Sequence, residues 1–242
     1  MLIHQERCLV HCRLCLPYCP MRAIVPDEMT GKMRIDQDEC VECEQCRRAN
    51  VCPAQALVMP ELGWPRILRN RFSNPLIVHP ETGVPGRGTE EMKTNEVTGR
   101  FRDNLVGMAV EMGRPGLGAR FRDIEKVAMA VARAGVHFDP RNPVTCLMED
   151  VSTGKMRADV LNEKVLSVII GFDLPREQIL LVLDELKEVM SGIGTVFSLD
   201  LTFRLEKDGG RPLINLLREA GFAPSRNGKL NVGLGRPLAR ED

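Results

Sequence analysis

The spacing of the cysteines constrains this chain more than any other feature of its sequence. Eight of the nine cysteines fall within the first 52 residues, in two runs that each end in Cys-Pro. Residues 19–25 (Cys-Pro-Met-Arg-Ala-Ile-Val) align with residues 52–58 (Cys-Pro-Ala-Gln-Ala-Leu-Val) at a constant offset of 33 positions. The repeat indicates an internal duplication. In a reducing compartment, cysteines clustered in this way indicate metal or redox chemistry rather than disulfides.

The two runs carry a recognisable spacing. The first reads C-x3-C-x2-C-x3-C-P and the second reads C-x2-C-x2-C-x5-C-P. The block, residues 1–60, resembles a bacterial-type ferredoxin domain with two [4Fe–4S] clusters, in which the fourth cysteine of each run binds the other cluster. The resemblance implies one ligand set for each cluster. Cluster I would be held by Cys8, Cys12, Cys15 and Cys52, and cluster II by Cys40, Cys43, Cys46 and Cys19.

Both departures from the family spacing affect cysteines assigned to cluster I. The gap after Cys8 is one residue longer than the family pattern, and the gap before Cys52 is two residues longer. We expect the loops to absorb these insertions and both clusters to form, with cluster I the more labile. His11, inside the first gap, is expected to be a solvated loop residue rather than a substitute ligand. The competing interpretation is structural zinc, which paired C-x2-C knuckles can bind.

Composition excludes several classes of function. Lys plus Arg equals Asp plus Glu at 33 each, so the chain lacks the basic excess typical of nucleic-acid or membrane-surface binders. No apolar run approaches the length of about 18 residues that a membrane span needs. The first residues do not form a secretory signal, so we expect a cytoplasmic protein.

Residues 61–99 differ in character from the cysteine block. Prolines and glycines recur through this segment, which predicts irregular chain that acts as a linker or a docking strap. Arg66, Arg69 and Arg71 form a basic cluster that either meets an acidic partner or remains solvated. The glycine-rich stretch at 83–95 could cradle an anion through its backbone N–H groups, although it lacks a P-loop ending and a contact loop is the simpler interpretation.

Residues 100–242 alternate strand and helix patterns. We expect strands at 104–112, 144–149, 163–172 and 195–205, helices at 119–134 and 176–190, and a weaker helix at 212–220 followed by a strand at 230–234. The strand and helix order β-α-β-β-α-β over about 100–207 is that of a ferredoxin-like plait, so the whole chain is predicted to be α+β. Cys146 is expected to be a buried, inert thiol on a strand, and His137 a loop or core residue. No catalytic residue is predicted.

Three functions fit these features. The first is electron transfer through two [4Fe–4S] clusters, in a dedicated subunit or accessory protein of an anaerobic oxidoreductase whose partner is a flavin or metalloenzyme subunit. The second is a regulator in which the clusters sense redox state and the plait binds a small molecule. The third is a reductase acting on a substrate between the lobes, which the lack of an acid–base constellation disfavours. The C-terminal domain is also a candidate for homo-oligomer contacts.

Overall fold

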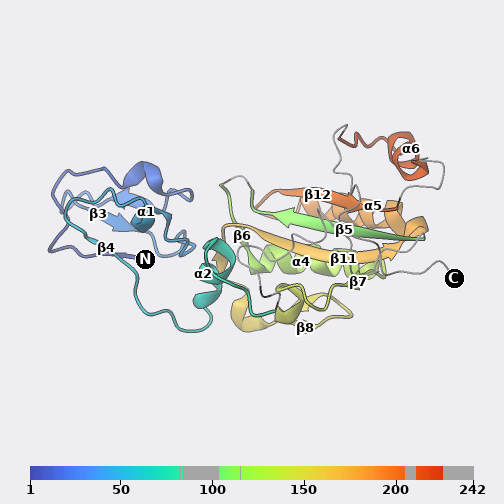
Figure 1. Ribbon diagram of the computed structural model, residues 1–242, viewed down its shortest axis with the longest axis horizontal. Helices are drawn as coiled ribbons and strands as arrows, with labels where there is room; N and C mark the ends of the chain where they lie inside the picture. Colours follow the sequence, from blue (N-terminus) through green and yellow to red (C-terminus); the bar gives the residue numbers. More distant parts are fainter. Residues whose placement is uncertain (82, 84–103, 115, 205–210, 226–242) are drawn as a thin grey trace.

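The computed structural model describes residues 1–81, 83, 104–114, 116–204 and 211–225. They form two lobes arranged end to end, with helix α2 (Ile67–Ser73) between them (Figure 1). The segment 83–95 apart from Gly83, and the strand expected at 230–234, lie outside the described residues. Among the described residues, no helix combines the length and apolar character that crossing a bilayer requires.

The first lobe, residues 1–59, is built from very short elements. Strand β1 (Leu2–Ile3) pairs with β4 (Leu57–Val58), and β2 (Ile24–Pro26) pairs with β3 (Met33–Ile35), both antiparallel. A 3-10 turn η1 (Leu16–Tyr18) and the single-turn helix α1 (Gln45–Arg48) complete the lobe. Its small core consists of short stretches of aliphatic side chains together with the cysteines themselves. So little apolar burial cannot stabilise a lobe of this size alone, which indicates that a bound group completes it.

The second lobe contains a four-stranded antiparallel sheet in the order β12-β5-β11-β7. The two inner strands are β5 (Leu105–Met112) and β11 (Val168–Pro175), and the outer ones are β12 (Phe197–Thr202) and β7 (His137–Phe138). The strands expected at 104–112 and 195–205 therefore form, and β12 is half-buried, as its alternating pattern indicates. The run at 163–172 divides into a short β10 (Lys164–Val165), paired with β6 (Ala119–Arg120), and the inner strand β11.

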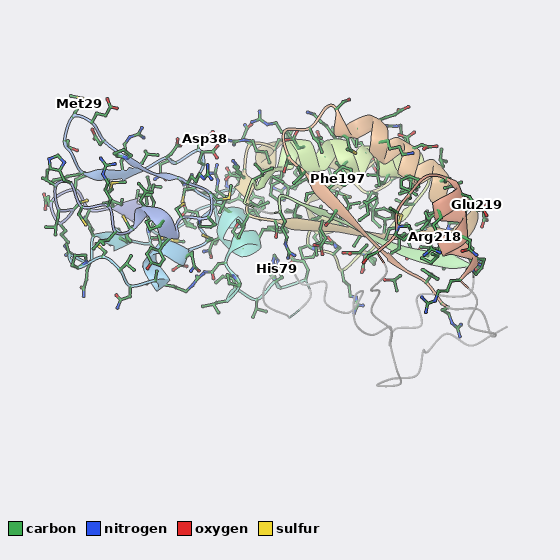
Figure 2. All side chains as sticks on the ribbon, turned by 90° about the horizontal axis from the view of Figure 1, so that it is seen from above. Met29, Asp38, His79, Phe197, Arg218 and Glu219 are labelled. Atoms are coloured by element: carbon green, nitrogen blue, oxygen red, sulfur yellow. The ribbon has the colours of Figure 1, made fainter. Side chains whose placement is uncertain are left out.

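Helices α4 (Phe121–Arg133) and α5 (Ile179–Met190) lie on the same face of this sheet (Figure 2). Alternate residues of β5, from Val106 to Met112, contribute to the core beneath them, together with Phe121 and Phe172. Along the chain the order is β5, α4, β7, β11, α5 and β12. The 3-10 turn η4 (Arg176–Gln178) leads into α5, and helix α6 (Pro212–Glu219) follows β12, as expected for 212–220.

Three expectations for the second lobe are wrong, one of them for His137, which lies exposed on β7 rather than in a loop or in the core. The second strand of the main sheet is β7, not 144–149; Pro140 and Pro143, which cannot donate to a strand ladder, lie between β7 and that stretch. Residues there form a 3-10 turn η2 (Thr145–Leu147) and strand β8 (Met148–Asp150), which pairs with β9 (Lys155–Met156) outside the main sheet. A further 3-10 turn η3 (Ala158–Val160) follows. Cys146 lies in η2 and is exposed rather than buried on a strand.

Candidate metal centre

The first cysteine hollow is lined by Cys8, Cys12, Cys15 and Cys52. Three of these cysteines come from one loop of the first run, and Cys52 comes from the end of the second run. Apolar residues complete the wall, including Ile3, Met33, Ala56 and Leu57. The hollow opens to solvent, and the empty space in it and at its mouth amounts to about 350 Å³.

The second hollow repeats this arrangement with the roles of the two runs exchanged. Cys40, Cys43 and Cys46 of the second run line it together with Cys19 from the end of the first run. The empty space in it and at its mouth amounts to about 320 Å³, and its apolar wall includes Met1, Met21, Ala23, Ile24 and Ile35. The Ala-Ile and Ala-Leu pairs that follow the two Cys-Pro sequences thus cover corresponding sides of the two hollows.

Backbone geometry also repeats between the halves. The Ala23 N–H donates a hydrogen bond to Cys19 Sγ at 3.2 Å, and the Ala56 N–H donates to Cys52 Sγ at 3.3 Å. Arg22 and Gln55, one residue before each donor, both adopt left-handed backbone with φ of 55° and 49°. All six described non-glycine residues with positive φ lie between positions 11 and 55. Left-handed backbone conformations of non-glycine residues cost free energy, so their concentration near the cysteines indicates a binding site around which the backbone is folded.

The spacing of the cysteines around each hollow distinguishes between zinc and an iron–sulfur cluster, the two groups that such cysteines commonly bind. A tetrahedral zinc ion with Zn–S bonds of about 2.3 Å would bring its sulfurs to about 3.8 Å from one another. Among the described residues, no three Cys, His, Asp or Glu side chains are grouped closely enough to hold one metal ion. Four cysteines that line one hollow without converging on a single point fit an iron–sulfur cube, whose irons stand at separate corners.

Burial keeps several of these thiols protonated in the absence of a cation. It raises the pKa of Cys15, Cys40 and Cys43, and it raises the pKa of Cys46 to about 12. The neighbouring cysteines Cys43 and Cys19 add to the rise at Cys46 by charge repulsion. Positively charged iron offsets both effects, so cluster binding and thiol deprotonation are coupled.

The second hollow adjoins the junction with the other lobe through helix α2. Arg69 is 5% exposed, and its Nη1 donates hydrogen bonds to the backbone oxygens of Gln37, Asp38 and Cys40 at 3.0, 3.0 and 2.9 Å. Its Nε pairs with Glu163 of the second lobe. One buried guanidinium therefore joins the loop that carries Cys40 to the sheet lobe.

Further contacts make the junction polar and specific. Asn70 Nδ2 donates to the Glu42 backbone oxygen at 2.7 Å, and Ser73 Oγ accepts a hydrogen bond from the Leu166 N–H at 2.8 Å. The buried Glu42 carboxylate accepts from Arg66 and from the Met1 ammonium. Across the junction Arg120 pairs with Asp38, and Lys164 pairs with Glu39.

The remaining residues singled out from the sequence lie away from the hollows. His11 is an exposed loop residue that does not line the first hollow, as expected. His137 lies on β7, largely exposed, with Nδ1 3.5 Å from Asp173 Oδ1. Arg66 and Arg69 bind acidic residues of this same chain, so the expectation of a solvated or partner-facing basic cluster is wrong for these two.

Sequence reasoning missed α2 as a helix, and with it the role of Asn70, Asn74 and Glu44 in bracing the second hollow. Asn70 and Asn74 both donate to the buried Glu44 carboxylate, which adjoins Cys43 and lines that hollow. The i, i+4 spacing of Asn70 and Asn74 beside the basic cluster could have indicated a helix there, but the prolines nearby favoured irregular chain.

Comparison with known proteins agrees with this geometry for the first lobe. A family model described as a 4Fe-4S dicluster domain matches residues 7–56. No curated protein and no solved structure matches the chain. Residues 7–56 thus form a dicluster ferredoxin domain with two [4Fe–4S] clusters, and a role in iron–sulfur electron transfer follows.

Proposed function

We propose that the dicluster ferredoxin domain at residues 7–56 is the electron-transfer module of a dedicated oxidoreductase subunit or accessory protein. The clusters, when bound, each accept and release one electron. The supporting observation is the pair of hollows, each lined by three cysteines of one run and one of the other. This interlocking brings two redox sites into one small lobe, which suits a relay of single electrons.

We assign the ligands accordingly. Cys8, Cys12, Cys15 and Cys52 hold cluster I, and Cys19, Cys40, Cys43 and Cys46 hold cluster II. The Ala23 and Ala56 N–H groups act on Cys19 and Cys52. These hydrogen bonds stabilise negative charge on the sulfurs, so they favour the reduced state of each cluster.

The rest of the chain is proposed to position the first lobe for a partner. Domain boundaries at 1–60, 61–99 and 100–242 fit the cysteine lobe, the strap that carries α2, and the sheet lobe. The order β5, α4, β7, β11, α5, β12 and the sheet order β12-β5-β11-β7 support a ferredoxin-like plait in the third region. The partner would be a flavin or metalloenzyme subunit of an anaerobic cytoplasmic oxidoreductase, and free cysteine usage supports a reducing compartment.

The test is the content and redox response of the anaerobically purified protein. We expect about eight iron and eight sulfide per chain, with visible absorption bleached by dithionite and two interacting signals in electron paramagnetic resonance. About four irons would mean that the longer gaps at Cys8 and Cys52 have cost cluster I and would contradict a two-cluster relay. Stoichiometric zinc without iron would contradict electron transfer altogether.

A further inference from the structure

The two hollows differ in what lies beside them. The second hollow adjoins the junction, where Met21 reaches the backbone at Gly118, so that a Cβ added to Gly118 would lie 2.8 Å from Met21 Cε. The first hollow is covered by Leu9 and Leu14, which are 52% and 56% exposed. Exposed leucines beside a redox site mark an interaction surface where they belong to a contiguous apolar patch.

The longer first cysteine gap lies in the same loop as these exposed leucines. The His11 N–H donates to the Gly31 backbone oxygen at 2.8 Å, and His11 adopts a left-handed φ of 59°. This anchors the loop to the β2–β3 hairpin, while Val10 remains 55% exposed. Met29, in the same hairpin, lies at the end of the molecule farthest from the sheet lobe (Figure 2). The loop with the longer gap thus exposes apolar side chains beside the hairpin at the end of the molecule farthest from the sheet lobe.

The apolar surface continues along the same loop and carries positive charge. Leu16 and Tyr18 of η1 are 37% and 42% exposed. Arg7 and Arg13 are exposed, and within the part of the chain that the structure describes neither of them forms an ion pair. The only acidic residue between positions 4 and 22 is Glu6. We call this surface the distal patch; it consists of Leu9, Val10, Leu14, Leu16 and Tyr18 with Arg7 and Arg13.

We infer that the distal patch is the docking site of a redox protein that presents an apolar centre within an acidic rim, and that electrons cross there to or from cluster I. This inference rests on the proposed electron-transfer function. The charge of the patch selects the partner, because exposed arginines attract an acidic surface. The leucines beside the first hollow would exclude water from the contact through which electrons reach cluster I. Cluster II, beside the junction with the sheet lobe, is then the inner site of the relay.

The test uses two small haem proteins of opposite charge as acceptors. Cytochrome b5 is acidic and cytochrome c is basic, and each takes one electron from the reduced protein, so that ferric haem becomes ferrous and one cluster becomes oxidised. Stopped-flow rates at low ionic strength are measured for the wild type and Arg13→Glu. We expect the variant to react about tenfold more slowly with cytochrome b5 and faster with cytochrome c, with both differences lost near 1 M salt.

Two matched controls separate the patch from the rest of the surface. Arg218→Glu makes the same charge change on an exposed residue at the opposite end of the molecule (Figure 2) and should leave both rates unchanged. Val10→Asp should slow cytochrome b5, whereas Val151→Asp, at an exposed valine of the other lobe, should not. Calorimetric titration of oxidised protein with ferric cytochrome b5 should show weaker binding for Arg13→Glu, independently of any electron transfer.

Other outcomes would overturn the inference. Equal rates for Arg13→Glu and wild type, or a larger effect of Arg218→Glu, would place docking elsewhere. Dimers that dissociate on Val10→Asp would assign the patch to a second copy of this chain, and Arg13-dependent binding to phosphatidylglycerol vesicles would assign it to a lipid surface. Iron content and bleaching by dithionite are measured on every variant: absent clusters contradict the proposed function, whereas intact clusters with indifferent rates contradict only the docking site.

Discussion

Replacement of Arg69 tests how the two lobes are joined. In Arg69→Leu the carboxylate of Glu163, whose side chain is 13% exposed, loses its cation inside the junction. The backbone oxygens of Gln37, Asp38 and Cys40 lose a charged donor at the same time. Breaking one partner of a buried ion pair costs about 3–5 kcal/mol, because an uncompensated charge stays buried. For a chain of this size that corresponds to a fall of about 10 °C in Tm.

The assay is anaerobic thermal unfolding of the holoprotein by circular dichroism at one scan rate, since cluster loss makes unfolding irreversible. Arg71→Leu, on the same helix but without an ion pair to any described residue, is the control and should shift Tm by no more than about 2 °C. The double variant Arg69→Leu/Glu163→Leu should recover part of the loss, because it removes the stranded carboxylate. A Tm for Arg69→Leu equal to that of Arg71→Leu, or no recovery in the double variant, would refute this reasoning.

Three further results are expected. Gly154→Ala should cost at least about 3 kcal/mol of unfolding free energy in chemical denaturation, because φ is 73° and the new Cβ would lie 2.6 Å from the Ala128 backbone; a loss below 1 kcal/mol would contradict it. Gly31→Ala should cost less unfolding free energy, about 1–2 kcal/mol, because its Cβ would meet movable side-chain atoms of Val10 and His11 at 3.1 Å. The same variant should lose iron from cluster I faster than the wild type, and an unchanged rate of iron release would contradict this expectation. Iron is then removed with an oxidant and a chelator, and unfolding is followed by calorimetry. The unfolding transition of the first lobe should disappear, whereas the transition of the second lobe should remain, because its core contains no cysteine. Loss of both transitions together would show that the lobes fold as one unit.

The cysteine lobe could be predicted closely because its structure is dictated by ligand spacing and a visible duplication. The sequence of this lobe has few apolar positions, but the repeated Cys-Pro sequences predict that the residues following them close each hollow. The Ala-Ile and Ala-Leu pairs lie where that reasoning expects them. The exposure of Leu9 and Leu14 could not be predicted, since no local pattern sets the position of their loop, which the His11 N–H joins to the Gly31 backbone oxygen twenty positions away.

In the sheet lobe, the long periodic elements were predictable and the short ones were not. Strand β5 and helices α4 and α5 carry strong apolar patterns over eight or more residues. Strand β7 has only two residues, His137 and Phe138, and pairs with β11 through tertiary packing, so no local signal marks it. Helix α2 forms within a proline-rich stretch because Leu68 and Phe72 bury one face in the core of the second lobe while Arg69 and Asn70 bind the first.

The crossed assignment of the cysteines is tested most directly by two double variants. Cys19→Ala/Cys43→Ala removes one cysteine from each run, but both cysteines line the second hollow. The cluster of the first hollow should therefore remain intact, with about four irons per chain and one unperturbed signal in electron paramagnetic resonance. Cys12→Ala/Cys19→Ala changes two cysteines of the same run but one lining residue of each hollow, so neither cluster should remain intact. Cys146→Ala, outside both hollows, should keep about eight irons. The reverse pattern, with an intact cluster in Cys12→Ala/Cys19→Ala and none in Cys19→Ala/Cys43→Ala, would contradict the interlocked arrangement of the two halves.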